Sequence, residues 1–184
     1  MSTAAPASGQ ATFVTPSRRR NVTLRRLARR CLMLADELAE TDKDLTLLIS
    51  KKAPELMAVY GVGTEIAGQL LVTAGDNPEC LKSEASFAAL CGASPLLASS
   101  GKTNRHRLNR GGDRAANSAL HRVVIVRMKS HPETRAYVER RTREGLSKRE
   151  IIRCLKRYVA RELLPYIVAA ASARPDLKPP SIAA

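Results

Sequence analysis

Leucines, together with one cysteine and one threonine, recur three and four positions apart over residues 24–48. This repeat limits the possible folds more than any other feature of the sequence. Its members are Leu24, Leu27, Cys31, Leu34, Leu38, Thr41, Leu45 and Leu48. The heptad spacing predicts a long α-helical arm over residues 21–53 that ends before Pro54 and carries a coiled-coil-like apolar seam. The alternative is an amphipathic helix packed on its own domain.

The rest of the chain also predicts helices, because no strand-like alternation lasts more than four residues. Helices are expected over residues 83–90, from Gly112 or Asp113 to His131, from Pro132 to a cap at Gly145, and from Lys148 to about Leu164. The predicted fold class is all-α: a coiled-coil-like helix followed by a compact helical domain over residues 54–170. A basic leader, residues 1–20, and a proline-containing tail, residues 171–184, are expected to be disordered.

The charge of the chain indicates a polyanionic partner. Lys and Arg number 31 against 17 Asp and Glu, which gives a formal net charge of +14. Nucleic acid is the partner that best fits this balance, and a basic protein of another kind is the alternative. Aromatic residues make up only 3% of the chain, which argues against single-strand readout by stacked rings and favours contact with the backbone of a duplex or of structured RNA.

Cysteine spacing and the absence of long apolar runs exclude several classes of protein. The four cysteines form no Cys-x-x-Cys pair, and no His lies at ligand spacing from them, which argues against a zinc site and against a secreted disulfide framework. The first twenty residues lack the apolar core of a signal peptide, and no apolar run approaches membrane length. We therefore expect a cytoplasmic protein with no metal site of its own and no membrane contact.

A Gly-x-Gly turn between two apolar segments is a candidate contact for nucleic acid. Gly61 and Gly63 flank Val62, and the sequence that follows predicts a second helix. The arrangement resembles a helix-hairpin-helix motif, in which glycines let backbone N–H groups at a helix N-terminus approach a phosphate. A plain tight connection between two helices is the alternative.

The segment from Leu90 to Arg114 combines hydroxyls, glycines and cations. Ser99 and Ser100 stand beside Gly101, and basic side chains follow at Lys102, Arg105, Arg107, Arg110 and Arg114. A hydroxyl in a flexible turn beside cations that could hold a phosphate is what attack on a phosphodiester requires. A solvated loop between helices is the alternative.

Taken in order, these residues resemble the C-terminal domain of the insertion-sequence-110 family of transposases over about residues 22–164. The pattern is carried by Gly61-Val62-Gly63, Ala67, Leu71, Gly75-Asp76, Phe87-Ala88, Leu90-Cys91-Gly92, Pro95, Ser99-Ser100-Gly101-Lys102, Arg107 to Asp113, Arg122, Tyr137, Arg140-Arg141 and Ser147 to Arg157. The resemblance implies DNA recombination through a phosphoserine link, with Ser100 or the adjacent Ser99 as nucleophile. It also implies DNA as a partner, and in several family members a structured guide RNA.

The resemblance further implies an N-terminal RuvC-like domain with four acidic metal ligands, and nothing before the helical arm of this sequence matches it. We therefore expect Mg²⁺ only where that acidic domain is supplied, and we expect this chain alone to bind nucleic acid without exchanging strands. Its enzymatic activity is an open question at this point. The predicted arm would join a second copy or a full-length transposase through residues 24–48. The alternative function is a non-catalytic binding or interaction protein, such as a remnant or inhibitor of an intact transposase.

Overall fold

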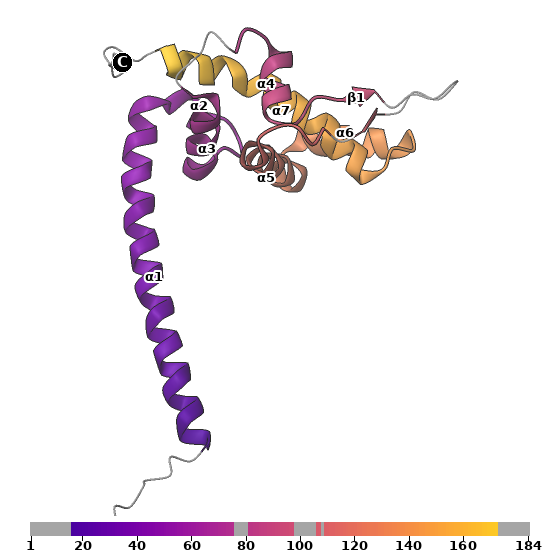
Figure 1. Ribbon diagram of the computed structural model, residues 1–184. Helices are drawn as coiled ribbons and strands as arrows, with labels where there is room; N and C mark the ends of the chain where they lie inside the picture. The colour runs from indigo at the N-terminus through magenta and orange to yellow at the C-terminus, as the bar shows by residue number, and fades with distance from the viewer. Residues whose placement is uncertain (1–15, 76–80, 98–105, 108, 173–184) are drawn as a thin grey trace, which may run out of the picture. The chain divides into compact units, whose positions relative to one another are not determined.

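The computed structural model describes residues 16–75, 81–97, 106, 107 and 109–172. Helices predominate among them, as Figure 1 shows, which confirms the predicted all-α class. The elements are α1 (Pro16–Lys52), α2 (Pro54–Ala58), α3 (Thr64–Ala74), α4 (Glu84–Leu90), β1 (Leu96–Leu97), β2 (His106–Arg107), α5 (Arg114–Ser130), α6 (Pro132–Arg143) and α7 (Lys148–Ser172).

The chain divides into two compact units, the first ending at Thr41 and the second beginning at Asp42. In the first unit, helix α1 begins at Pro16, inside the leader that the sequence analysis assigned to residues 1–20. The earlier start has a local reason, because proline suits the first turn of a helix and the three arginines that follow are good helix formers. Residues 1–15 of the predicted leader lie outside the described residues.

The last turns of α1 belong to the second unit and depart from the predicted seam. Ile49 is 7% exposed and packs into the core beside the half-buried Leu45, whereas the predicted seam residue Leu48 is 65% exposed. A helix repeats every 3.6 residues and a heptad seam every 3.5, so a long straight helix drifts away from the heptad positions. Ile49, four positions after Leu45, therefore faces the core, and Leu48, three positions after Leu45, does not.

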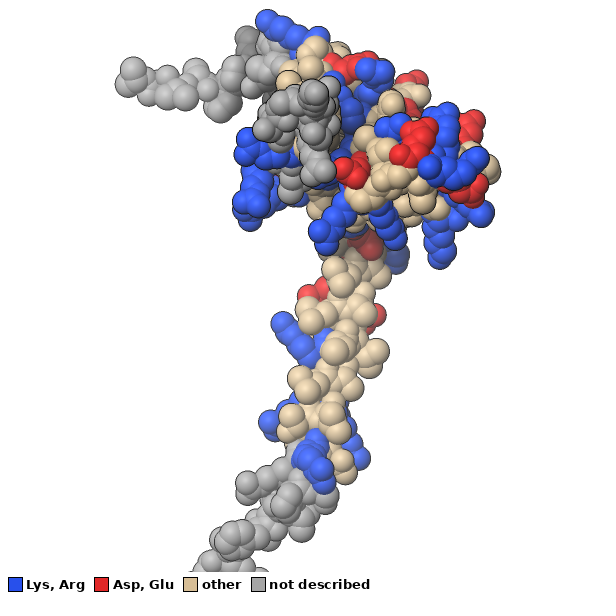
Figure 2. Space-filling model, turned by 90° about the vertical axis from the view of Figure 1, so that its right-hand side faces the viewer, with Lys and Arg blue, Asp and Glu red and all other residues tan. Residues whose placement is uncertain are grey.

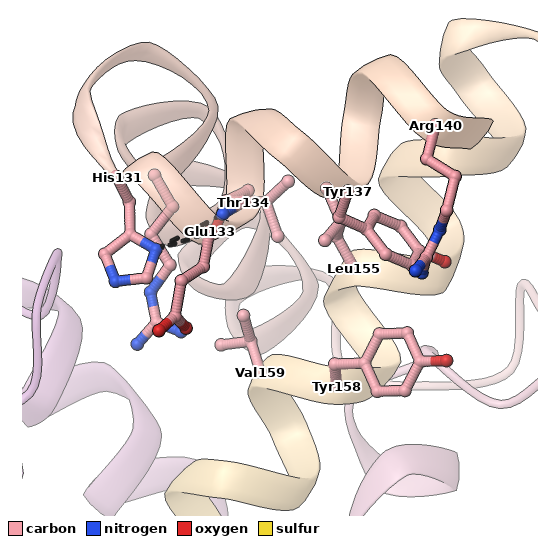
Figure 3. A pocket seen from close by; sticks show the side chains of 10 residues that line it. His131, Glu133, Thr134, Tyr137, Arg140, Leu155, Tyr158 and Val159 are labelled. Atoms are coloured by element: carbon pink, nitrogen blue, oxygen red, sulfur yellow. Dashed lines mark hydrogen bonds between the residues drawn. The ribbon is translucent and has the colours of Figure 1, made fainter. Parts of the chain in front are cut away.

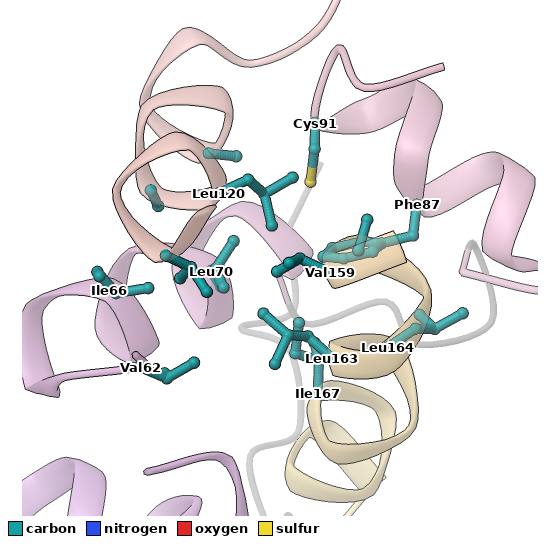
Figure 4. Packing of buried hydrophobic residues seen from close by; sticks show 14 of the residues in the cluster. Val62, Ile66, Leu70, Phe87, Cys91, Leu120, Val159, Leu163, Leu164 and Ile167 are labelled. Atoms are coloured by element: carbon teal, nitrogen blue, oxygen red, sulfur yellow. The ribbon is translucent and has the colours of Figure 1, made fainter. Parts of the chain in front are cut away.

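The hydrophobic core of the second unit lies where α3, α4, α5 and α7 meet. Figure 4 shows Leu70, Phe87, Leu120 and Leu163 pointing toward one another from these four helices, and all four are fully buried. Small residues at Ala67, Ala88, Ala116, Ala119 and Ala160 are also buried and let the helices approach closely. Large and small apolar residues from all four helices thus form one core.

Helix starts in this unit follow local capping signals that the sequence analysis recognised. The side chain of Ser83 caps α4, that of Asp113 caps α5, and Pro132 occupies the first turn of α6. Ser147 and Glu150 form the predicted capping box before α7: the Ser147 N–H donates to Glu150 Oε2 over 2.9 Å, and the Glu150 N–H donates to Ser147 Oγ over 3.4 Å. Gly145 adopts φ 87°, which suits the residue after a helix end.

Helix α7 continues beyond its predicted end near Leu164, because it passes through Pro165 and ends at Ser172. Proline removes one helical hydrogen bond and normally ends a helix. Here Ile167 and Ala170 are buried in the core beyond it, and this burial outweighs the lost bond. Residues 173–184 of the predicted tail lie outside the described residues. No helix in the described part of the chain is both long and apolar enough to span a bilayer.

Candidate nucleic-acid interface

Two short strands that the sequence analysis missed frame the serine-bearing segment. Strands β1 and β2 pair antiparallel, with Leu96 opposite Arg107 and Leu97 opposite His106. Leu97 and His106, the described residues on either side of residues 98–105, therefore lie opposite each other. The predicted site residues Ser99, Ser100, Lys102 and Arg105 belong to that segment and lie outside the described residues.

A glycine pair fixes the two backbones that lead into and out of these strands. Gly92 turns the chain after α4 with φ 61°, a left-handed conformation that glycine adopts without strain. Gly112 lies against it so closely that a Cβ at Gly112 would stand 2.1 Å from the Gly92 nitrogen and 2.8 Å from the Ala89 carbonyl oxygen. The Asp113 N–H then donates to the Leu90 carbonyl over 2.7 Å. These contacts hold the end of α4 against the start of α5, and we call this joined region the support of strands β1 and β2.

Asp113 ties this support to α3. Its Oδ1 accepts a hydrogen bond from the Ala115 N–H over 2.8 Å, and its Oδ2 accepts one from the Thr73 hydroxyl over 2.6 Å. The Thr73 hydrogen bond, followed by the backbone N–H of Ala115, lowers the pKa of the Asp113 carboxyl below its ordinary value. Asp113 therefore remains a charged cap well into the acidic range.

A buried lysine supports the same turn from α7. Lys156 is 6% exposed, and its Nζ donates to Asn117 Oδ1 over 2.8 Å. Asn117 in turn donates through Nδ2 to the carbonyl oxygens of Cys91 over 2.8 Å and Gly92 over 3.1 Å. Burial lowers the pKa of Lys156, and the positive charge of Arg153 lowers it further.

Cations from three separate segments converge on one pocket beside the strands. The pocket has a volume of about 500 Å³ and is lined on one side by the turn after Gly92, by β2 and by Asn109, and on the other by the end of α6 and the start of α7. Its basic lining residues are Arg107, Arg141, Arg153, Lys156 and Arg157, and its acidic one is Glu150. We call this pocket the cationic pocket.

Figure 2 shows Lys and Arg side chains over much of the helical unit, with acidic side chains interspersed among them. Two acidic residues near the pocket are already engaged within their own elements: Glu144 pairs with Arg141, and Glu150 accepts from the Ser147 backbone. The pocket itself therefore carries a clear excess of positive charge, which suits a phosphate-bearing ligand.

The structure brings together only some of the basic residues that the sequence analysis singled out. Arg107 lines the cationic pocket, whereas Arg110 and Arg114 are exposed outside its lining. The sequence analysis did not select Arg141, Arg153 or Arg157 as site residues. The four-residue spacing of Arg153 and Arg157 was the available signal, since it places both on one face of a helix.

The two glycines of the predicted hairpin have different surroundings, and neither lines the cationic pocket. Gly61, with φ 86°, packs on α5, where a Cβ would lie 3.5 Å from Val123 and 3.6 Å from Arg127. Gly63 precedes α3 and is open, with no atom within 4 Å of a Cβ placed there. Arg127 holds the turn by donating through Nε to the Tyr60 carbonyl over 2.9 Å while its guanidinium pairs with Glu162. A turn between two helices is thus present, and its contact with nucleic acid stays a prediction.

A second pocket of about 360 Å³ lies between α5, α6 and α7 (Figure 3). The Tyr137 and Tyr158 rings meet edge to face with centroids 5.8 Å apart, and the Arg140 guanidinium lies 5.3 Å from the Tyr137 ring. His131 accepts a hydrogen bond from the Thr134 N–H over 3.4 Å and so caps α6. These contacts account for the polar groups of the pocket as parts of the fold. In the described residues, no three His, Cys, Asp or Glu side chains come together as a metal site.

Comparison with known proteins covers the segment that contains this support. Residues 53–139 match the family described as Transposase IS116/IS110/IS902 family. Over those residues the chain is similar to that family. The matched range includes both strands and α5, and it ends before Arg141 and before α7.

The chain is also similar to a protein named "Insertion element IS110 uncharacterized 43.6 kDa protein" from Streptomyces coelicolor (strain ATCC BAA-471 / A3(2) / M145). The two are 29% identical over 141 residues, which is 76% of this chain and 33% of the relative. The chain therefore spans about a third of the length of the curated relative that it matches. Both findings agree with the resemblance to a C-terminal transposase segment.

Proposed function

We propose that this transposase segment binds duplex DNA through the cationic pocket. The observation that carries the proposal is the convergence of Arg107 from β2, Arg141 from α6, and Arg153 and Arg157 from α7 on one pocket. Strand β2 directly follows the serine-bearing segment in the sequence. Guanidinium groups bind phosphate oxygens bidentately, and such contacts position a duplex without reading its sequence. The net charge of +14 would assist association.

We further propose that Ser100, or the adjacent Ser99, is the nucleophile of DNA strand transfer when a RuvC-like acidic domain complements this segment. The proposal rests on the family match and on the position of the segment between two strands whose ends border the cationic pocket. In this step the serine oxygen bonds to phosphorus and the bond from phosphorus to one bridging oxygen of the DNA breaks. That oxygen leaves as a DNA hydroxyl and takes up a proton in exchange for the one that the serine loses, and negative charge builds on the phosphate oxygens during the attack. Each arginine aimed at that charge contributes about 3 kcal/mol in catalytic sites.

DNA affinity of the full chain tests the binding part of the proposal. The variant Arg153→Gln/Arg157→Gln is compared with Lys129→Gln/Arg135→Gln, which removes the same charge from exposed residues outside the pocket. We expect the pocket variant to bind a fluorescent duplex at least tenfold more weakly and the control variant to bind nearly as the parent does. Equal losses in both variants would contradict a pocket-specific site, and exclusive binding of a structured RNA competitor would assign the pocket to RNA.

Covalent trapping tests the chemical part of the proposal. A complete transposase carrying this segment is incubated with the ends of its element, and the protein–DNA adduct is resolved on a denaturing gel. Ser100→Ala should abolish the adduct and leave DNA affinity unchanged, since the hydroxyl is proposed for chemistry and not for binding. An adduct retained in Ser100→Ala and lost in Ser99→Ala would transfer the role to Ser99. An adduct retained in both single variants and in the double variant would exclude a serine nucleophile here.

A further inference from the structure

The smaller pocket, between α5, α6 and α7, has no part in the proposed function. Three of its lining residues, Val124, Leu155 and Val159, are buried and apolar. Its volume of about 360 Å³ falls within the roughly 300–1,000 Å³ that is usual for ligand pockets. Figure 3 shows Tyr137 and Tyr158 together at one end of it. We call it the tyrosine pocket.

The two tyrosines of this pocket form a surface suited to a planar ligand. Their rings meet edge to face with centroids 5.8 Å apart, and this contact orients both rings. Tyr158 nevertheless remains 52% exposed. An exposed aromatic ring is a platform on which a nucleobase stacks. One platform takes one base, so the low aromatic content of the chain does not exclude a site of this kind.

The charges of the tyrosine pocket are nearly balanced, unlike those of the cationic pocket. Its charged lining residues are Arg127, Arg140 and Glu133. The Arg127 guanidinium is already paired with Glu162, and the Arg140 guanidinium lies 5.3 Å from the centroid of the Tyr137 ring. Neither arginine is therefore as available to a phosphate as those of the cationic pocket. The tyrosine pocket suits an uncharged planar ring better than a second phosphate.

The tyrosine pocket adjoins the cationic pocket, because Tyr158 lines both. Two consecutive arginines of α6 are divided between the pockets: Arg140 lines the tyrosine pocket and Arg141 lines the cationic one. Their guanidinium groups lie 5.3 Å and 6.0 Å from the centroid of the same ring, that of Tyr137. In a DNA strand every base is joined through one sugar to a phosphate. A strand with a phosphate in the cationic pocket can therefore place the attached base against Tyr158.

We propose that the tyrosine pocket holds one unstacked DNA base against the Tyr158 ring while the phosphate joined to that base lies in the cationic pocket. The inference rests on the proposed function, because the cationic pocket supplies the phosphate contact. A base inside an intact duplex is stacked and paired, so it enters a protein pocket only after leaving the stack. The preferred ligand of the two pockets together is thus a duplex with an unpaired nucleotide.

Three duplexes of one sequence separate the base from the phosphates: a fully paired duplex, a duplex with one unpaired adenine, and a duplex with an abasic residue at the unpaired position. The last two carry the same phosphates and differ only in the base. We expect the full chain to bind the adenine duplex at least about fivefold more tightly than the abasic one, because stacking on an aromatic ring contributes at least that much per base. Equal affinity for these two duplexes would overturn the inference.

Variants of exposed tyrosines assign the preference to one ring. Tyr158→Ala should abolish it and leave the affinities for the paired and abasic duplexes as in the parent, whereas Tyr158→Phe should keep it because the ring remains. Tyr60→Ala is the matched control, since Tyr60 is 46% exposed and lines neither pocket. A preference retained in Tyr158→Ala, or lost equally in Tyr60→Ala, would contradict the inference.

Photo-cross-linking of the parent chain locates the base without any variant. Iodouracil replaces the unpaired adenine, the complex is irradiated, and the modified peptide is identified by mass spectrometry. We expect the cross-link at Tyr158 or Tyr137. A cross-link only to residues outside the lining of the tyrosine pocket would overturn the inference.

The fully paired duplex keeps this inference separate from the proposed function. If Arg153→Gln/Arg157→Gln weakens binding of the paired duplex but the parent shows no preference for the unpaired base, the proposed function stands and the base site is refuted. If that variant binds the paired duplex as the parent does, the proposed function itself fails. A preference for the unpaired base that is present only when the strands are RNA would overturn the assignment to DNA.

Discussion

Gly112 is the residue at which the backbone tolerates the least change. Its α-carbon faces the Gly92 backbone with no room for a side chain. Gly112→Ala should lower the free energy of unfolding by about 3 kcal/mol, because two backbone segments must separate to admit a methyl group. Urea denaturation measures the change. Gly111→Ala is the matched control, since its Cβ would meet one side-chain oxygen at 3.4 Å. A loss in Gly111→Ala as large as in Gly112→Ala would contradict the close approach.

Arg127 and Arg122 both form ion pairs, but only the Arg127 guanidinium is buried. Arg127 is buried, donates to the Tyr60 carbonyl and pairs with Glu162, whereas Arg122 pairs with Glu65 on the surface. Arg127→Met should cost roughly 2–4 kcal/mol of stability, because it leaves a carbonyl and a carboxylate without their donor. Arg122→Met should cost less than about 1 kcal/mol. Thermal and urea unfolding of both variants provide the comparison, and equal costs would refute the distinction.

Asp113 makes the free energy of unfolding depend on pH in the acidic range. Its carboxyl has a pKa below the ordinary value of 3.8, chiefly because of the Thr73 hydroxyl. The charged carboxylate therefore stabilises the folded state at pH values above the unfolded pKa, and this contribution is lost as the pH falls through the lower folded pKa.

The variant Asp113→Asn removes this titration while keeping the shape of the cap. It should be less stable than the parent by on the order of 1 kcal/mol at neutral pH, since a charge-assisted hydrogen bond is lost. The difference should shrink as the pH falls below 3.8. Urea midpoints of the two proteins from pH 7 to pH 3 test this expectation. A difference that is constant over the range would contradict it.

At the scale of elements, two prolines differ in their position within a helix. Pro165 lies inside α7, whereas Pro132 opens α6. Pro165→Ala should raise the free energy of unfolding by about 1 kcal/mol or more, because alanine restores a helical hydrogen bond to the Arg161 carbonyl. Pro132→Ala should leave stability unchanged or slightly lower, since proline is pre-organised for a first turn. Melting temperatures of the two variants test both expectations. A lower melting temperature for Pro165→Ala would show that the proline itself is required by the packing.

Elements whose boundaries depend on local signals were predictable from the sequence. Ser83, Asp113 and Ser147 cap helices through bonds to residues two or three positions away, so a single sequence shows them. Strands β1 and β2 were not predictable, because two residues leave no alternation and their pairing joins residues ten or so apart. The end of α7 was misplaced because tertiary burial of Ile167 overrides the proline before it.

The residues of the candidate site were likewise only partly predictable from the sequence. Arg107 was predicted because it stands in the serine-bearing stretch, and its neighbours Arg110 and Arg114 were predicted with it. Arg153 and Arg157 were not selected as site residues, because sequence periodicity does not show what a helix face contacts. Their convergence with Arg107 depends on how α7 packs beside α4 and α5, which is tertiary information.

At the scale of the whole molecule, the chain carries a basic helical unit that is similar over residues 53–139 to the IS116/IS110/IS902 transposase family, and a long helix, α1, with exposed leucines. The cytoplasmic location stays a prediction. The central claim is that the cationic pocket engages phosphates directly, and this claim implies a defined salt dependence. Each phosphate contact with duplex DNA contributes about −0.9 to the slope of log affinity against log salt concentration.

The most direct test is that slope, measured for the full chain and for Arg153→Gln/Arg157→Gln on one duplex, with Lys129→Gln/Arg135→Gln as the charge-matched control. If both pocket arginines contact phosphates, the pocket variant loses about 1.8 from the magnitude of the slope, and the control keeps the slope of the parent. An unchanged slope in the pocket variant, or the same loss in the control, would contradict the account.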